Sequence, residues 1–273
     1  MRDVIKKYGL TAKKKLGQHF LVDGFVLEKI VAGADIGSED LVIEIGPGVG
    51  ALTQALAKKA GHVIAIELDK TLVPVLEDLF ADEPVTIVRG DILKIDLPPL
   101  VRPYGHMSIK AVANLPYYIT TPVIFSLLEG ETVFRSITVM VQKEVANRMV
   151  AKPATKDYGA LTLAIRYYAD VSLVANVPVN CFMPRPGVDS AVVRLDVLRQ
   201  PRVDADKDAF FKLVKAAFGK RRKTLVNCLE GFGYGKAGLE EMLVKLGINP
   251  NTRGEALDIH AFGELTKMLG GVK

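Results

Sequence analysis

Short apolar runs alternate with amphipathic stretches along the first 200 residues. Asp23 precedes apolar residues at helical spacing, which predicts a helix to about Ala34. Five β-branched runs predict buried strands at 41–45, 62–68, 85–89, 109–114 and 136–142. Helices are expected at 51–60 and, interrupted by Pro74, at 69–80. This alternation predicts a doubly wound, mostly parallel sheet.

The pattern changes towards the carboxyl end. Two helical stretches are expected within 143–169, around a loop at 152–159. The segments 171–177 and 190–198 then form strands, which predicts a seven-stranded sheet with an antiparallel hairpin end. Beyond them only helices are expected, at 206–219, 221–230, 236–246 and 255–269. We therefore expect an α/β domain over 1–200 and a small all-helical domain over 201–273.

Composition is that of a globular protein, because 49% of the 273 residues are hydrophobic and 25% charged. No apolar run is long enough to span a bilayer, and the basic N-terminus lacks the pattern of a secretory signal. The two cysteines, Cys181 and Cys228, are isolated from one another. A cytoplasmic, monomeric protein is the expectation.

The basic residues are concentrated in two segments, 1–15 and 212–223. Together these hold 12 basic residues and one acidic residue, whereas the remaining chain has 24 basic and 30 acidic residues. Such an uneven distribution is typical of a protein that binds a polyanion such as RNA. The predicted RNA contacts are Lys13, Lys15, Arg221, Arg222 and Lys223. The run at 220–223 is expected to open a helix, where the helix dipole disfavours cations and an external anion would be needed.

A glycine-rich loop follows the first predicted strand as Glu44-Ile-Gly46-Pro-Gly48-Val-Gly50. Glycines let the backbone approach a ligand closely, and the following helix offers free N–H groups. The spacing differs from the G-x-G-x-x-G of dinucleotide sites and favours a nucleoside-sulfonium ligand. Glu67 and Asp91 end the next two strands, where carboxylates can accept hydrogen bonds from ribose hydroxyls and an adenine amine.

Asn114-Leu115-Pro116-Tyr117 ends the fourth strand. The exocyclic amine of adenine is a poor nucleophile, since its lone pair is delocalised into the ring. The Asn114 side-chain carbonyl and the Leu115 backbone carbonyl can accept its protons and favour the pyramidal form. Pro116 stiffens the backbone, and Tyr117 offers a ring on which an extruded base can stack. This motif predicts methylation of an adenine amine.

Together these motifs resemble the KsgA family of small-subunit ribosomal RNA adenine N6,N6-dimethyltransferases, over almost the whole chain. Further segments similar to the family are 15–21 (KLGQHFL), 182–190 (FMPRPGVDS) and 218–225 (FGKRRKTL). The resemblance implies a Rossmann-like fold that uses S-adenosylmethionine, and a substrate of two adjacent adenosines in the 3′-terminal hairpin of the RNA of an assembling small subunit. Position 19 is often asparagine in relatives, so His19 departs from the commonest pattern.

The resemblance also implies which residues form the site. The implied cofactor residues are Gln18, His19, Leu21, Glu44, Gly46, Gly48, Glu67, Asp91, Ile92 and Asn114. The implied catalytic residues, which would grip the target adenine, are Asn114, Leu115, Pro116, Tyr117 and Phe182.

Several alternatives remain open. The same motifs suit a large-subunit RNA methyltransferase of the antibiotic-resistance type, although 182–190 and 221–224 fit the small-subunit family better. A ribosome assembly factor without turnover is a second alternative, but it need not keep the complete Asn114–Tyr117 set. The four histidines are scattered without metal-ligand spacing, so no metal is expected. A nicotinamide dehydrogenase is disfavoured by the glycine spacing.

Overall fold

A computed structural model of the chain describes residues 4, 7–10, 12–13, 17–220 and 222–270. The chain divides into two compact units. One comprises Met1–Ala146 with Ser172–Val197, and the other comprises Asn147–Val171 with Leu198–Lys273. The expected boundary near residue 200 does not coincide with this division, because 147–171 pack with the helices that follow residue 198.

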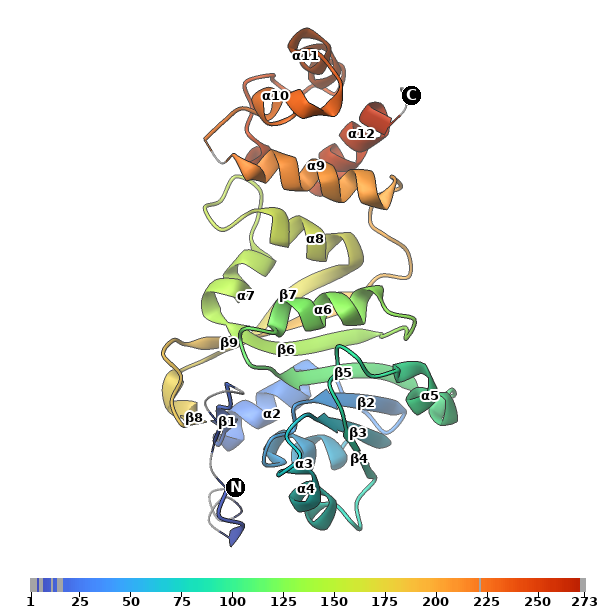
Figure 1. Cartoon of the computed structure of the whole chain (residues 1–273), viewed down its shortest axis with the longest axis vertical. Coiled ribbons are helices and arrows are strands. Elements are labelled where there is room, and N and C mark those ends of the chain that lie inside the picture. The colour runs from blue at the N-terminus through green and yellow to red at the C-terminus, as the bar shows by residue number, and fades with distance from the viewer. Residues whose placement is uncertain (1–3, 5–6, 11, 14–16, 221, 271–273) are drawn as a thin grey trace. The chain divides into compact units, whose positions relative to one another are not determined.

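The first unit is built on a seven-stranded sheet of order β4-β3-β2-β5-β6-β9-β7 (Figure 1). Its strands are β2 (Asp40–Ile45), β3 (His62–Glu67), β4 (Val85–Arg89), β5 (Ser108–Asn114), β6 (Ser136–Gln142), β7 (Ala169–Val177) and β9 (Ser190–Val197). Strands β2 to β6 pair in parallel, and β9 pairs with β6 in antiparallel register, with Val139 opposite Val193. The predicted mostly parallel sheet with an antiparallel end is confirmed.

The helices of this unit follow the predicted rhythm with local differences. They are α2 (Gly24–Gly33), α3 (Ala51–Ala57), α4 (Val73–Leu79), α5 (Leu97–Val101) and α6 (Thr120–Glu129), followed by α7 (Lys143–Val150), which runs on into the second unit. Asp23 caps α2 as predicted, accepting from the Val26 amide at 3.0 Å. The predicted helix at 69–80 is shorter than expected: Pro74 lies in its first turn, so α4 begins only at Val73.

A second, two-stranded sheet was missed by the sequence analysis. Strand β1 (Phe20–Leu21) pairs antiparallel with β8 (Phe182–Met183), placing Phe20 opposite Met183 and Leu21 opposite Phe182. Each strand has only two residues, too few for an alternating pattern to be recognised. The pair joins segments about 160 positions apart in the sequence.

The second unit contains the helices that surround their own apolar core. They are α8 (Ala160–Tyr168), α9 (Lys207–Gly219), α10 (Leu225–Cys228), α11 (Lys236–Lys245) and α12 (Ile259–Gly270). Phe210 and Phe262 are completely buried in that core. The helix expected at 221–230 begins only at Leu225, after Thr224. The basic run therefore does not open a helix: Lys220 caps the C-terminus of α9, a favourable place for a cation, and Arg222 and Lys223 lie in the turn that follows.

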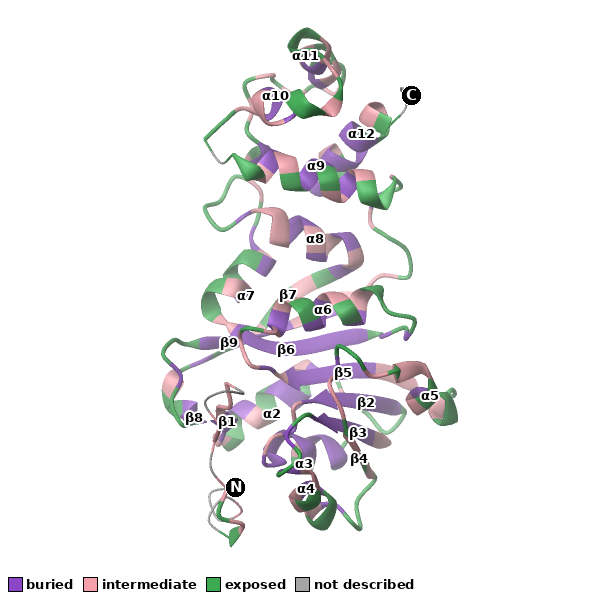
Figure 2. Cartoon of the chain, in the orientation of Figure 1, coloured by how far each residue is buried: buried purple, intermediate pink, exposed green. Residues whose placement is uncertain are grey.

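The central strands of the sheet are buried along most of their length, whereas the edge strand β4 is partly exposed (Figure 2). Burial extends to a charged residue on β5, Lys110. Its ammonium lies 2.9 Å from the Asp40 carboxylate and also donates to the Asp35 carbonyl. The pair neutralises both charges, which makes a lysine tolerable inside the sheet.

Glu44 of β2 is a second buried ionisable residue, with a relative exposure of only 1%. Neither carboxylate oxygen makes a hydrogen bond of standard geometry to a described residue. Burial raises the pKa of Glu44 to about 8; the Thr53 hydroxyl lowers it somewhat, and the nearby Glu67 carboxylate raises it further. Near neutral pH the side chain is therefore mainly protonated.

Replacing Glu44 by glutamine is expected to change how stability depends on pH. Since the native pKa lies above the unfolded value of about 4.5, the native state holds the extra proton between the two values, and wild-type stability falls as pH rises from 4.5 to 8. Glu44→Gln removes this dependence. As pH rises from 4.5 to 8, the unfolding free energy of the variant should therefore increase relative to that of wild type, by up to about 1.4 kcal/mol per pH unit. Urea unfolding at pH 5, 7 and 9 measures this, with exposed Glu39→Gln as the control. A pH-independent difference would contradict the prediction.

Candidate active site

A pocket lies at the carboxyl ends of the parallel strands, where the loops after β2, β3, β4 and β5 converge. The segment 17–21 and Phe182 complete its wall. Residues predicted for the site that line this pocket are Gln18, His19, Leu21, Gly46, Gly48, Glu67, Asp91, Ile92, Asn114, Leu115, Pro116, Tyr117 and Phe182. Parallel strands present their carboxyl ends at one edge of a sheet, which is why motifs far apart in the sequence meet here.

Glu44 is the exception among the predicted cofactor residues. Its neighbour Ile45 lines the pocket, whereas Glu44 is enclosed in the core and is not part of the lining. Successive side chains of a strand point to opposite faces, and the Glu44 side chain is on the face of β2 that packs into the core. The structure places the Glu44 side chain in the core, near Thr53 and Glu67, and its predicted role as a cofactor residue stays a prediction.

The glycine loop and Glu67 are joined directly. One Glu67 carboxylate oxygen accepts from the Gly48 amide at 3.1 Å, and the other accepts from the Asp69 amide at 2.7 Å. Burial raises the pKa of Glu67, and these backbone hydrogen bonds oppose the rise. Each carboxylate oxygen can accept more than one hydrogen bond, so the side chain can still bind a ligand hydroxyl.

Gly48 has the left-handed φ of +58°, and a Cβ built there would lie 3.1 Å from the ring of Phe20. A side chain at this position would therefore be strained and would also crowd the segment that covers the loop. Gly46 has φ +70°, and a Cβ built there would lie 3.7 Å from the Asn114 carbonyl oxygen. The two glycines thus let the loop pack closely against Phe20 and the end of β5, and both line the pocket with their backbone.

The carboxylate of Asp69, two residues beyond Glu67, holds the N-terminal segment. It lies 2.7 Å from the Lys13 ammonium and 3.1 Å from the Gln18 side-chain amide. Burial acts to raise the pKa of Asp69, but hydrogen bonds from Lys13, Thr71 and Gln18 outweigh it and lower the pKa to about 2. The predicted RNA contact Lys13 is thus engaged by a buried carboxylate, and Asp69 is a structural residue that the sequence analysis missed.

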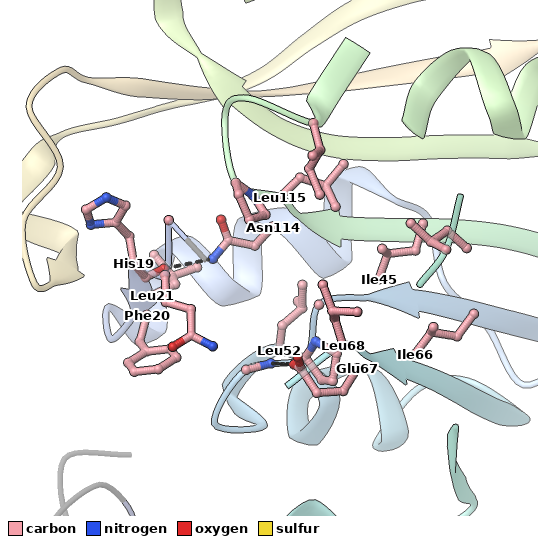
Figure 3. Close-up of a pocket in the computed structure, with 18 of the residues that line it drawn as sticks. His19, Phe20, Leu21, Ile45, Leu52, Ile66, Glu67, Leu68, Asn114 and Leu115 are labelled. Atoms are coloured by element: carbon pink, nitrogen blue, oxygen red, sulfur yellow. Dashed lines mark hydrogen bonds between the residues drawn. The ribbon is translucent and has the colours of Figure 1, made fainter. Parts of the chain in front are cut away.

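The Asn114 side chain has a defined orientation. Its amide nitrogen donates to the backbone carbonyl of His19 at 3.3 Å (Figure 3). Since a carbonyl can only accept, the Asn114 nitrogen must face His19, and the amide oxygen is turned the other way. No described residue donates a hydrogen bond to the adjacent Leu115 carbonyl. Two acceptors, one from each residue, are therefore available at the end of β5.

Aromatic and hydroxyl groups complete this end of the pocket. The Tyr117 hydroxyl lies 2.8 Å from that of Ser190, which is fully buried on β9. Burial raises the pKa of Tyr117, so its hydroxyl is neutral at physiological pH. The bond to Ser190 restrains the ring. Phe182, buried on β8, forms another part of the wall, and Tyr118, which the sequence analysis did not single out, is exposed at the rim.

The remaining predicted residues lie elsewhere or outside the description. Arg222 and Lys223 are exposed in the second unit and do not line the pocket. Lys15 and Arg221 lie outside the described residues. Within the described part of the chain, no group of three histidine, cysteine, aspartate or glutamate side chains is arranged to hold a metal, and no helix is long and apolar enough to cross a membrane.

Comparisons with known proteins agree with this geometry. A family model described as ribosomal RNA adenine dimethylase matches residues 9–269. Two relatives are named ribosomal RNA small subunit methyltransferase A. The one from Lachnoclostridium phytofermentans is 48% identical, over 98% of this chain and 94% of the relative. The one from Alkaliphilus oremlandii is 45% identical, over 98% of this chain and 95% of the relative.

Two solved structures are similar over nearly their whole length. A dimethyladenosine transferase from Plasmodium falciparum has a TM-score of 0.80 at 28% identity, covering 93% of this chain and 98% of that one. The 23S rRNA methyltransferase ErmE has a TM-score of 0.72 at 26% identity, covering 92% and 99%. The fold is thus the Rossmann-like fold of S-adenosylmethionine-dependent methyltransferases. With a family match that spans nearly all of its residues, the chain belongs to the ribosomal RNA adenine dimethylase family.

Proposed function

We propose that this protein transfers methyl groups from S-adenosylmethionine to N6 of adenosines in small-subunit ribosomal RNA, twice per base. The observation that carries the proposal is the pair of acceptors at the end of β5: the Asn114 amide oxygen, oriented by the His19 carbonyl, and the Leu115 carbonyl. Two acceptors match the two protons of an adenine amine. The names of the relatives at 45–48% identity support the small subunit as the source of the RNA.

The pocket fits the proposed cofactor at its other end. The partly desolvated Glu67 carboxylate would accept from ribose hydroxyls, and Asp91 would accept from the adenine amine of the cofactor. Gly46 and Gly48 line the pocket, so that the backbone of the loop would contact the remainder of the molecule. When bound, S-adenosylmethionine supplies an electrophilic methyl group. Gln18, Leu21 and Ile92 would contribute to its enclosure.

The chain's residues act on the target base mainly by positioning it. Hydrogen bonds from N6 to Asn114 and Leu115 favour the pyramidal amine and localise its lone pair. Pro116 keeps the two acceptors in place, and Tyr117, restrained by Ser190, would stack on the base opposite the wall formed by Phe182. Holding the reactants in a fixed geometry lowers the entropic part of the activation barrier, which is how such a site would accelerate the transfer.

We further propose that the RNA is held by the basic turn of the second unit, and that the enzyme acts in the cytoplasm, as a monomer, during ribosome biogenesis. Arg222 and Lys223 are exposed, and no described carboxylate forms an ion pair with either. Unpaired exposed cations are available to phosphates. Two adjacent adenosines of the 3′-terminal hairpin, implied by the family resemblance, are the proposed targets.

Methyl transfer from labelled S-adenosylmethionine to unmethylated small and large ribosomal subunits tests the proposal. Dimethyladenosine is expected in the small subunit alone after nucleoside analysis. Label in the large subunit would instead favour the activity in the name of ErmE, to which the fold is also similar. An absence of label, with cofactor binding measured separately, would favour a non-catalytic assembly factor.

Asn114→Ala is expected to reduce methyl transfer at least 100-fold, because it removes the only side-chain acceptor proposed for N6. The fold should persist, since Asn114 is at the end of its strand and only partly buried. Single-turnover rates on small subunits measure the effect, and Asn180→Ala, outside the pocket lining, is the matched control. Turnover near that of wild type would contradict the proposed role.

Neutralising the basic turn is expected to weaken the salt dependence of RNA binding. Each phosphate contact contributes about 0.7–0.9 to the slope of log affinity against log salt, so Arg222→Gln with Lys223→Gln should lower the slope by about 1 to 2. The matched control is Lys245→Gln with Lys267→Gln, which removes the same charge from the same unit but at lysines already paired with Glu241 and Glu264. Equal slopes for the two double variants would place the RNA contact elsewhere.

A further inference from the structure

Tyr118 is an exposed aromatic residue at the rim of the pocket. It belongs to the pocket lining, yet its relative exposure is 62%. Of the large hydrophobic residues that are exposed in the described part of the chain, Leu68 and Tyr118 are the two that line this pocket, and Tyr118 is the aromatic one. No described residue forms a hydrogen bond with its hydroxyl. The ring is therefore available to a ligand that reaches the pocket from solvent.

A turn holds Tyr117 and Tyr118 in a fixed relation to one another. The Ile119 amide donates to the Pro116 carbonyl at 3.1 Å, which closes a four-residue turn with the two tyrosines at its centre. The Thr120 hydroxyl donates to the same carbonyl at 3.2 Å. Both rings line the pocket, but the first is restrained by a buried hydroxyl and the second is open to solvent.

One part of the Tyr118 ring lies against the segment 17–21. Gly17 has φ +61°, and a Cβ built there would lie 3.4 Å from Tyr118 Cε1 and 3.2 Å from Pro116 Cβ. Because position 17 has no side chain, the segment can pass close to the ring and restrain it while the larger part of the ring stays accessible. A ring that is already restrained loses little conformational freedom when a ligand stacks on it.

Extrusion of the target base leaves the neighbouring nucleotide without a stacking partner. In the proposed reaction an adenine leaves its stack and enters the pocket, where Tyr117 would hold it. The RNA chain keeps the next nucleotide close to the rim, because the two are joined by one phosphate. Stacking on an aromatic side chain is favourable for any base, since every base has a π-face. Tyr118, next in sequence to Tyr117 and exposed at the rim, can supply the missing partner.

Resting on the proposed function, we propose that Tyr118 forms a second base subsite, in which its ring stacks on the nucleotide adjacent to the target adenosine. The Tyr117 ring, bonded to Ser190, holds the target base, and the Tyr118 ring holds its neighbour. The subsite contributes to RNA affinity and does not touch the reacting atoms. It accepts any base, because stacking does not depend on the hydrogen-bonding edge.

Three variants of Tyr118 separate the aromatic ring from the bulk of the side chain. Tyr118→Leu keeps an apolar side chain without a ring, Tyr118→Ala removes the side chain beyond Cβ, and Tyr118→Phe keeps the ring without the hydroxyl. Phe25→Leu and Phe25→Ala are the matched controls, because Phe25 is an aromatic residue of similar exposure, 65%, outside the pocket lining. Methylation rates against small-subunit concentration, at saturating S-adenosylmethionine, are measured together with the affinity for S-adenosylhomocysteine.

Tyr118→Leu and Tyr118→Ala should need about ten-fold more small subunit for half of the maximal rate, the loss expected for one base–aromatic stack. Tyr118→Phe should rescue most of this loss, and both Phe25 controls should behave as wild type. The maximal rate should change less than about two-fold, because binding that is equal in the ground state and the transition state affects KM alone. Affinity for S-adenosylhomocysteine should stay at the wild-type value in every variant.

Cross-linking identifies the base that lies on the ring. The full-length protein with p-benzoylphenylalanine at position 118 is irradiated on unmethylated small subunits in the presence of S-adenosylhomocysteine. The cross-link should map to the nucleotide next to the one that wild type converts to dimethyladenosine. The same photoreactive residue at position 25 should give no cross-link there.

Several results would overturn the inference. Equal half-saturation by Tyr118→Leu and Tyr118→Phe would exclude stacking on the ring. Weaker binding of S-adenosylhomocysteine by Tyr118→Leu would make the residue a support for the segment 17–21. Cross-links only to nucleotides distant from the target would place another part of the RNA on Tyr118. If Tyr118→Ala did not fold, the leucine and phenylalanine variants would decide. Failure of the proposed function is distinguishable, since wild type itself would then transfer no methyl group to small subunits.

Discussion

The hydrogen bond between the Asn114 amide and the His19 carbonyl is the interaction on which the site depends. It turns the Asn114 oxygen away from His19, and the acceptor pair at the end of β5 exists only in that orientation. The His19 carbonyl is placed by the pairing of β1 with β8, which also carries Phe182 to the pocket wall. A pairing of two residues on each side therefore links the cofactor end of the pocket to the proposed adenine end.

Three carboxylates in or near the pocket differ in how strongly their surroundings favour the charged form. Asp69 is held ionised by Lys13, Thr71 and Gln18, Glu67 is partly desolvated and bonded to two backbone amides, and Glu44 is enclosed and mainly protonated. Burial disfavours charge in all three, and the partners decide the outcome. The N-terminal segment is thus attached by a charge that remains paired, while the glycine loop rests on a carboxylate that can still accept from a ligand.

The two units contribute different chemistry. The first unit contains the complete pocket, while the second offers an exposed basic turn around Arg222 and Lys223. These two cations have no described ion-pair partner, so they are available to the phosphates of an RNA. Phosphate contacts of this kind would hold the RNA independently of the base that reacts. A base drawn from its stack costs free energy, and contacts made elsewhere on the RNA can offset that cost.

The sequence determined the parallel sheet, its order of motifs and most of the pocket lining. An apolar run predicts a buried strand, because the local pattern of hydrophobic residues indicates burial. The glycine or polar residues that follow such runs are expected to meet, because parallel strands end at the same edge of the sheet. Tertiary structure alone decided what depends on distant partners. The β1–β8 pair was too short to show a pattern, and 147–171 joined the helical unit through packing. Glu44 was predicted to contact the cofactor and Lys13 to contact RNA, yet the Glu44 side chain faces the core and Lys13 forms an ion pair with Asp69. Whether a polar side chain meets ligand, core or partner depends on which atoms surround it in space, and nothing in its neighbours along the chain specifies them.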